Sequence, residues 1–224
     1  MKYKAIIFDM DGTIIDTAHI WDHATKTFLA KRGIIVTPEI ELELGRKFSG
    51  LATSECCKII KERFKLEDSL ATMIEEKSAH ADELFEKGVK FIEGFTQFHD
   101  KAINLNLKVG LATNASDQTV AITNKALNLE RFFGSHIYNI THVNNLFKPN
   151  PALYLHAAKQ LGIDPAQCIA IEDSFHGIRA ALDAGMLCIG INTGKKPERI
   201  AESNFIIDRY DQIKLEELLE LLPL

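Results

Sequence analysis

The sequence predicts an α/β protein: a Rossmann-like, doubly wound parallel sheet with a small all-helical cap domain inserted after the first strand. Short apolar runs alternate with helical patterns along most of the chain. Residues 17–88 break this alternation, because they show helical patterns only. Polar residues follow several of the apolar runs directly, where the strands of a parallel sheet would end.

The predicted strands are short and apolar. They cover residues 3–8, 108–113, 136–138, 168–171, 187–191 and 205–207. Helical patterns lie between most of them, at residues 117–127, 151–161, 175–184 and 215–222. Asn150 can cap a helix that begins with Pro151, and Gly185 can end the helix that begins near Ser174. This alternation is typical of a parallel sheet with helices on both faces.

The segment without strands is the predicted cap. It offers up to four helices, near residues 18–31, 38–44, 52–64 and 68–86. A purely helical insertion after the first strand of an α/β core forms a second, smaller domain. We therefore expect a core of residues 1–16 and 89–224 and a cap of residues 17–88.

Composition excludes several classes of function. The formal net charge is −5, without the basic excess that binding to nucleic acid requires. No run approaches the roughly 20 apolar residues of a membrane helix, and only four apolar residues precede Asp9, too few for a signal peptide. The four cysteines lack metal-ligand spacing, so we expect buried thiols in a cytoplasmic monomer.

Charged and polar groups gather at the predicted strand ends and before one helix. The carboxyl ends of parallel strands meet at one edge of a sheet, so we expect these groups to form one site. They are Asp9, Asp11, Thr113, Asn114, Lys148, Glu172 and Asp173.

Electrostatics indicates what such a site would bind. Two carboxylates about 4 Å apart repel by roughly 4 kcal/mol at an effective dielectric constant near 20. The predicted site holds four carboxylates, those of Asp9, Asp11, Glu172 and Asp173, so it needs a compensating cation. Mg²⁺, which prefers oxygen ligands, fits best. Lys148 adds a further positive charge. A phosphoryl group would bridge the metal and the lysine, with the Thr113 hydroxyl as another donor.

Four segments resemble, in order, the motifs of the haloacid dehalogenase superfamily. They are DMDGTIIDT at 9–17, LATNAS at 111–116, FKPNP around Lys148 and IEDSFHGIRAALDAG at 171–185. The resemblance spans nearly the whole chain. The helical insertion between the first two segments is similar to the subfamily with an α-helical cap, which includes phosphoglucomutase-like and phosphoglycolate phosphatase-like enzymes.

The resemblance implies a role for each of these residues in the reaction. Asp9 would be the nucleophile that forms an aspartyl-phosphate. Asp11 would protonate the leaving oxygen and then deprotonate the attacking water. Thr113 and Asn114 would position the phosphoryl group, and Lys148 would neutralise it and orient Asp9.

The resemblance also implies a Mg²⁺ site. The Asp9 carboxylate, the main-chain carbonyl of Asp11 and Asp173 would bind the ion, with Glu172 as a further ligand or a neighbour of the ligands. Gly12 would give the loop after the first strand room to turn.

No motif identifies the residues of the cap that would contact the substrate. Trp21 would line the cleft between the domains or pack within the cap. Arg46, Lys47 and Ser49 form a polar stretch between predicted cap helices, which is either a place for substrate contacts or a solvated turn.

Together these features predict a Mg²⁺-dependent phosphatase acting on a small phosphorylated metabolite, such as a sugar phosphate. Asp11 disfavours dehalogenation, because a halide leaves without a proton. One alternative is a sugar phosphomutase similar to β-phosphoglucomutase. Trp21 replaces the cap histidine of those enzymes, and Ser49 and Thr53 stand where they carry a lysine and an arginine. A catalytically idle phosphate-binding module is the other alternative.

Overall fold

The computed structural model describes residues 2–220 and contains a six-stranded parallel sheet in the order β3-β2-β1-β4-β5-β6. The strands are β1 (Ala5–Phe8), β2 (Lys108–Thr113), β3 (Ile137–Asn139), β4 (Cys168–Glu172), β5 (Leu187–Ile191) and β6 (Phe205–Ile207). This confirms the predicted fold class. The order of the strands reverses between β1 and β4, which is where ligands bind in open α/β sheets.

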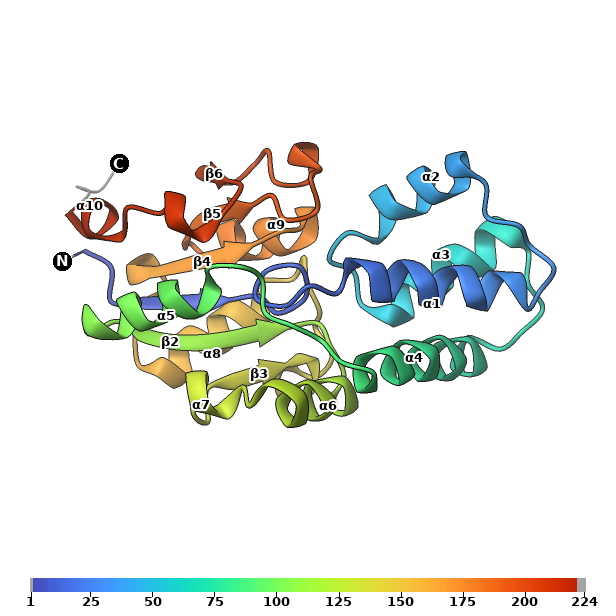
Figure 1. Cartoon of the computed structure of the whole chain (residues 1–224), viewed down its shortest axis with the longest axis horizontal. Helices are drawn as coiled ribbons and strands as arrows, with labels where there is room; N and C mark the ends of the chain where they lie inside the picture. The colour runs from blue at the N-terminus through green and yellow to red at the C-terminus, as the bar shows by residue number, and fades with distance from the viewer. Residues whose placement is uncertain (1, 221–224) are drawn as a thin grey trace.

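Alternate residues of β1 face two different apolar cores. Ile6 and Phe8 pack in one core with α5 (Phe95–Asn104) and α10 (Leu215–Glu220). Ala5 and Ile7 pack in the other core with α8 (Ala152–Leu161) and α9 (Phe175–Asp183). Because successive side chains of a strand point to opposite faces, this places helices on both faces of the sheet, as Figure 1 shows.

Four helices lie between β1 and β2 in the chain: α1 (Ala18–Ala30), α2 (Pro38–Phe48), α3 (Thr53–Phe64) and α4 (Leu70–Glu86). They share an apolar cluster of their own, which includes Phe28, Leu44, Ile60 and Met73. Figure 1 shows them beyond the end of the sheet toward which β2 points. We call these four helices the cap, and its status as a separate domain stays a prediction.

Some predicted elements differ from the structure. Helix α5 and the short helix α7 (Glu130–Phe133) were not predicted, although α6 (Asp117–Leu127) was. Helix α2 runs through Arg46 and Lys47, which we expected between helices; basic side chains in a last turn interact favourably with the helix dipole. The predicted end of the last helix at residues 221–222 lies outside the described residues. No helix among residues 2–220 is both long and apolar enough to span a membrane.

Candidate active site

The predicted site residues meet at the carboxyl ends of the central strands. Asp9 follows β1, Thr113 ends β2, and Glu172 and Asp173 stand at the end of β4. Lys148 comes from the loop before α8 and reaches the same place. A cavity of about 420 Å³ opens there between the sheet and the cap.

Lys148 lies at the centre of this cluster and is 1% exposed. Its Nζ donates hydrogen bonds to Asp9 Oδ1 at 2.6 Å, to Glu172 Oε1 at 2.6 Å and to the Ala112 carbonyl at 2.8 Å. Burial alone would lower the pKa of Lys148, but the two neighbouring carboxylates raise it above its ordinary value. The ammonium therefore stays charged beside Asp9.

Glu172 is fully buried, and both of its carboxylate oxygens accept hydrogen bonds. Oε1 accepts from Lys148 and from the Tyr154 hydroxyl at 2.8 Å, and Oε2 accepts from Ser174 Oγ at 2.9 Å. A metal ion would compete with these donors for the same oxygens. The geometry therefore favours Glu172 as a residue that orients Lys148.

Asp9, Glu172 and Asp173 each place one carboxylate oxygen within 4.8 Å of the oxygens of the other two residues. Burial, with a further contribution from Glu172, raises the pKa of Asp9 to about 8. Burial, followed by the charge of Asp9, also raises the pKa of Asp173 well above its usual range. Buried carboxyl groups at this spacing are the donors that a hard divalent cation binds, so the residues fit such an ion.

Gly12 allows the loop after β1 to approach Asp173. Its φ of +78° lies in the left-handed region, and a Cβ at this position would lie 2.3 Å from Asp173 Oδ2. Any side chain here would displace Asp173 from the carboxylate cluster. The predicted reason for Gly12, room for the loop to turn, therefore has a second component, the close approach of a carboxylate.

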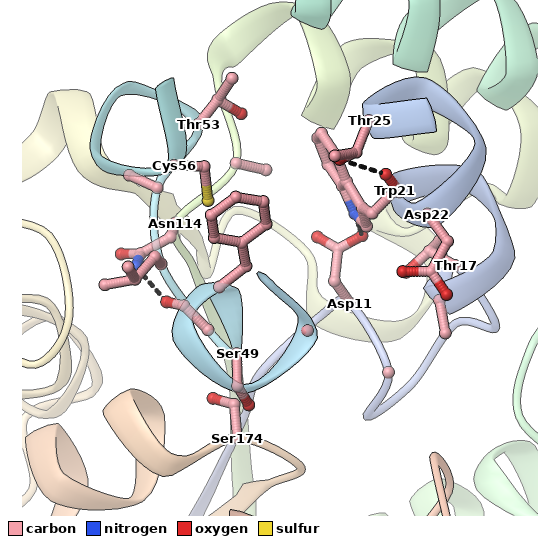
Figure 2. A pocket seen from close by; sticks show the side chains of 18 of the residues that line it. Asp11, Thr17, Trp21, Asp22, Thr25, Ser49, Thr53, Cys56, Asn114 and Ser174 are labelled. Atoms are coloured by element: carbon pink, nitrogen blue, oxygen red, sulfur yellow. Dashed lines mark hydrogen bonds between the residues drawn. The ribbon is translucent and has the colours of Figure 1, made fainter. Parts of the chain in front are cut away.

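Asp11 contacts the cap. Trp21 Nε1, on α1, donates a hydrogen bond of 3.0 Å to Asp11 Oδ1, as Figure 2 shows. Burial raises the pKa of Asp11, and the hydrogen bond from Trp21 opposes that rise. Trp21 also packs against Phe85 of α4, so it both lines the cavity and packs within the cap.

The loop between α2 and α3 is held against the core through its main-chain carbonyls. Asn114 Nδ2 donates to the Gly50 carbonyl at 2.9 Å, and His176 Nδ1 lies 2.6 Å from the Ser49 carbonyl. Since the Asn114 side-chain oxygen accepts from the Lys148 main-chain N–H, Asn114 connects the cap to the lysine loop. Ser49 is among the residues that line the cavity, and its hydroxyl is buried without a partner among the described residues.

The structure does not bring every predicted residue to the cavity. Arg46 and Lys47 are not among the residues that line it, and Lys47 pairs with Glu43 on the surface of α2. Several residues that the sequence reasoning missed do line it. They are Lys77 on α4, and Lys196 and Arg199 after β5.

Comparisons of this chain with known proteins all indicate related enzymes. Residues 6–191 match the family model described as haloacid dehalogenase-like hydrolase. A Bacillus subtilis protein named "Putative phosphatase YhcW" is 30% identical, over 97% of this chain and 93% of its own length. The phosphorylated carbohydrates phosphatase of Thermotoga maritima is 26% identical over 82% of each chain. A crystal structure of β-phosphoglucomutase from Clostridium difficile superposes with a TM-score of 0.77 at 26% identity, covering 97% of this chain and 96% of that one.

Proposed function

Because the chain belongs to the haloacid dehalogenase-like hydrolases and is a phosphoric monoester hydrolase, we propose that it hydrolyses a small phosphorylated metabolite through an aspartyl-phosphate on Asp9. The observation that carries this proposal is the 2.6 Å contact between Lys148 Nζ and Asp9 Oδ1 inside a buried carboxylate cluster. The name of the Thermotoga maritima relative, a phosphorylated carbohydrates phosphatase, favours a sugar phosphate as the substrate class.

In the proposed first step, the Asp9 carboxylate attacks phosphorus and the P–O bond of the ester breaks. Asp11 gives its proton to the departing oxygen. Lys148, Thr113 and main-chain N–H groups stabilise the phosphoryl oxygens during transfer. The half-buried position of Asp11 supports this role, because desolvation raises its pKa and favours the protonated form that donates.

In the second step, a water molecule attacks the aspartyl-phosphate and Asp11 takes up its proton. Phosphate then leaves, and Asp9 returns to its carboxylate form. Asp9, Asp173 and the main-chain carbonyl of Asp11 would hold Mg²⁺, with Glu172 alongside. When bound, the ion would neutralise the carboxylates and polarise the phosphoryl oxygens.

The mutase alternative is less favoured. A mutase must protect its phosphorylated form from water while the sugar reorients, and it uses cap contacts to do so. Here Trp21 and Thr53 line the cavity at positions where a histidine and an arginine would be expected in a mutase. Glucose 1-phosphate separates the two activities, because hydrolysis releases phosphate whereas a mutase yields glucose 6-phosphate.

The deciding experiment follows phosphate release from p-nitrophenyl phosphate and from a panel of phosphorylated metabolites, with and without Mg²⁺. We expect turnover that depends on Mg²⁺ in the wild type and at least about a 10³-fold loss in Asp9→Asn, which retains the shape of the side chain. No turnover of any substrate would favour the phosphate-binding module instead.

A further inference from the structure

Five charged side chains are almost completely buried in the described part of the chain: Asp9, Lys77, Asp82, Lys148 and Glu172. Three of them form the Lys148 cluster, and Asp82 accepts a hydrogen bond from the Thr119 hydroxyl at 3.1 Å. Lys77 is 2% exposed and has neither a hydrogen-bond partner nor an ion-pair partner among residues 2–220. It is the buried charge that the proposed reaction leaves unexplained.

Lys77 interrupts an apolar stripe of helix α4. Met73, Ala81 and Phe85 are fully buried and stand at four-residue spacing along the same face. The helical period requires another apolar residue between Met73 and Ala81, and the chain has a lysine there. An unpaired ammonium destabilises a buried site, so its position indicates a partner that arrives from solution.

The ammonium group faces the cavity above the carboxylate cluster. Lys77 lines this cavity, and its Nζ lies 5.1 Å from the centroid of the Trp21 ring. The same indole donates its Nε1–H to Asp11. Trp21 therefore contacts both the proposed acid and the ammonium, so Lys77 would meet a part of the substrate other than the reacting phosphoryl group.

Other basic groups that line the cavity have protein partners or solvent. Lys26 pairs with Glu41 at 2.8 Å. Arg199 donates to the Gly45 carbonyl through one terminal guanidinium nitrogen, although its Nε is buried without a partner among the described residues. Lys196 is only half-buried, so water can solvate its charge. Among the described residues that line the cavity, Lys148 is almost completely buried but contacts its carboxylates, whereas Lys77 is almost completely buried and has no hydrogen-bond or ion-pair partner.

We propose that Lys77 binds a second anionic group of the substrate, a carboxylate or a phosphate at the end remote from the transferred phosphoryl group. This inference rests on the proposed phosphatase function and narrows its substrates to phosphomonoesters with a second negative charge. The Trp21 ring supplies a cation–π contact that holds the ammonium in place before the substrate enters.

The test compares ligands that differ only in the remote group. Dissociation constants are measured by calorimetry with Mg²⁺ in the full-length Asp9→Asn protein, which binds without turnover. One pair is 6-phosphogluconate and sorbitol 6-phosphate; another is fructose 1,6-bisphosphate and fructose 6-phosphate. The first pair tests a carboxylate and the second a phosphate. We expect the charged member of at least one pair to bind about tenfold more tightly.

Variants of Lys77, made in the same Asp9→Asn protein, test whether this lysine causes the preference for the charged ligand. Lys77→Met should abolish it, Lys77→Arg should retain it, and Lys58→Met, which removes an exposed cap lysine, should leave it unchanged. Thermal melting checks folding, and Lys77→Met should melt no lower than its parent because methionine retains the apolar stem. Equal constants within both pairs, absence of binding, or a preference that survives in Lys77→Met would overturn the proposal. Failure of the phosphatase function itself would appear separately, as no turnover of p-nitrophenyl phosphate by the wild type.

Discussion

Trp21 Nε1 and Asp11 Oδ1 are joined by a 3.0 Å hydrogen bond between a cap helix and the loop after β1. The orientation of Asp11, which we propose as acid and base, therefore depends on the position of the cap helix that carries Trp21. Movement of α1 away from the sheet would break this bond, and closure would restore it. Cap closure and orientation of Asp11 are thereby linked in one contact.

Trp21→Phe removes this donor and retains an aromatic ring. A typical hydrogen bond contributes about 0.5–1.5 kcal/mol, so we expect kcat to fall by roughly twofold to tenfold. Steady-state kinetics with p-nitrophenyl phosphate measures the change. Trp21→His retains a ring N–H and should lose less activity. An unchanged kcat in Trp21→Phe would show that the bond does not contribute to the reaction.

Asp11→Asn removes the proposed acid and base but leaves the nucleophile in place. We expect hydrolysis of the aspartyl-phosphate to slow more than metal binding weakens, because the attacking water loses its base. Mass spectrometry after exposure to substrate should detect added phosphate on the variant. If no phosphate is found on the protein, the role assigned to Asp11 is contradicted.

The placement of Asp9, Thr113 and Asp173 at one edge of the sheet was predictable because polar residues directly follow the buried strands. Their roles in catalysis stay a prediction. Helix α5 was missed although Phe95, Phe98 and Ala102 are buried at helical spacing, so the signal was present. The fold class therefore followed from periodicity, whereas the helices α5 and α7 were not predicted.

The contacts between cap and core could not be predicted in the same way. Lys77 is distant in sequence from every motif, and its only signal is a lysine in an apolar stripe. Arg46 and Lys47 were expected near the substrate, but α2 extends further and leaves them outside the cavity. Which residues of an inserted helical segment face the sheet depends on tertiary packing, and one sequence does not encode it as a pattern.

Lys148→Met should destabilise the fold as well as abolish activity. The ammonium lies 2.6 Å from both Asp9 and Glu172, and its loss leaves two buried carboxyl groups without their cation. Removing one partner of a buried ion pair costs about 3–5 kcal/mol. For a chain of this size we expect the melting temperature to fall by roughly 6–20 °C. Lys58→Met, which breaks an exposed pair with Glu55, is the matched control. Similar melting of the two variants would contradict the structural role of Lys148.

Mg²⁺ should stabilise the protein and support its activity. Chelation with EDTA should abolish turnover, and added Mg²⁺ should restore it. An ion at 100 times its dissociation constant adds about 2.7 kcal/mol to the free energy of unfolding. Calorimetric melting measures this gain, and Asp173→Asn, which removes one carboxylate of the cluster, should lose most of it. The same gain in wild type and variant would place the ion elsewhere.

Gly50→Ala should displace the loop between α2 and α3 from the core, because the added methyl group would clash with Ser174. Gly50 has a φ of +74°, and a Cβ there would lie 2.3 Å from Ser174 Oγ. Its carbonyl accepts the hydrogen bond from Asn114, so displacement of this loop also loosens the residue that contacts the Lys148 loop.

Gly33→Ala is a matched control for this variant. Gly33 also lies in the cap with a φ of +70°, but no atom lies within 4 Å of a Cβ built there. Both variants carry the strain of a left-handed residue, about 1–2 kcal/mol, and should lower the melting temperature. Gly50→Ala alone should lower kcat/KM, by about tenfold or more, because a displaced cap moves Trp21 from Asp11. Equal kcat/KM in the two variants would show that a clash between residue 50 and Ser174 does not affect the activity.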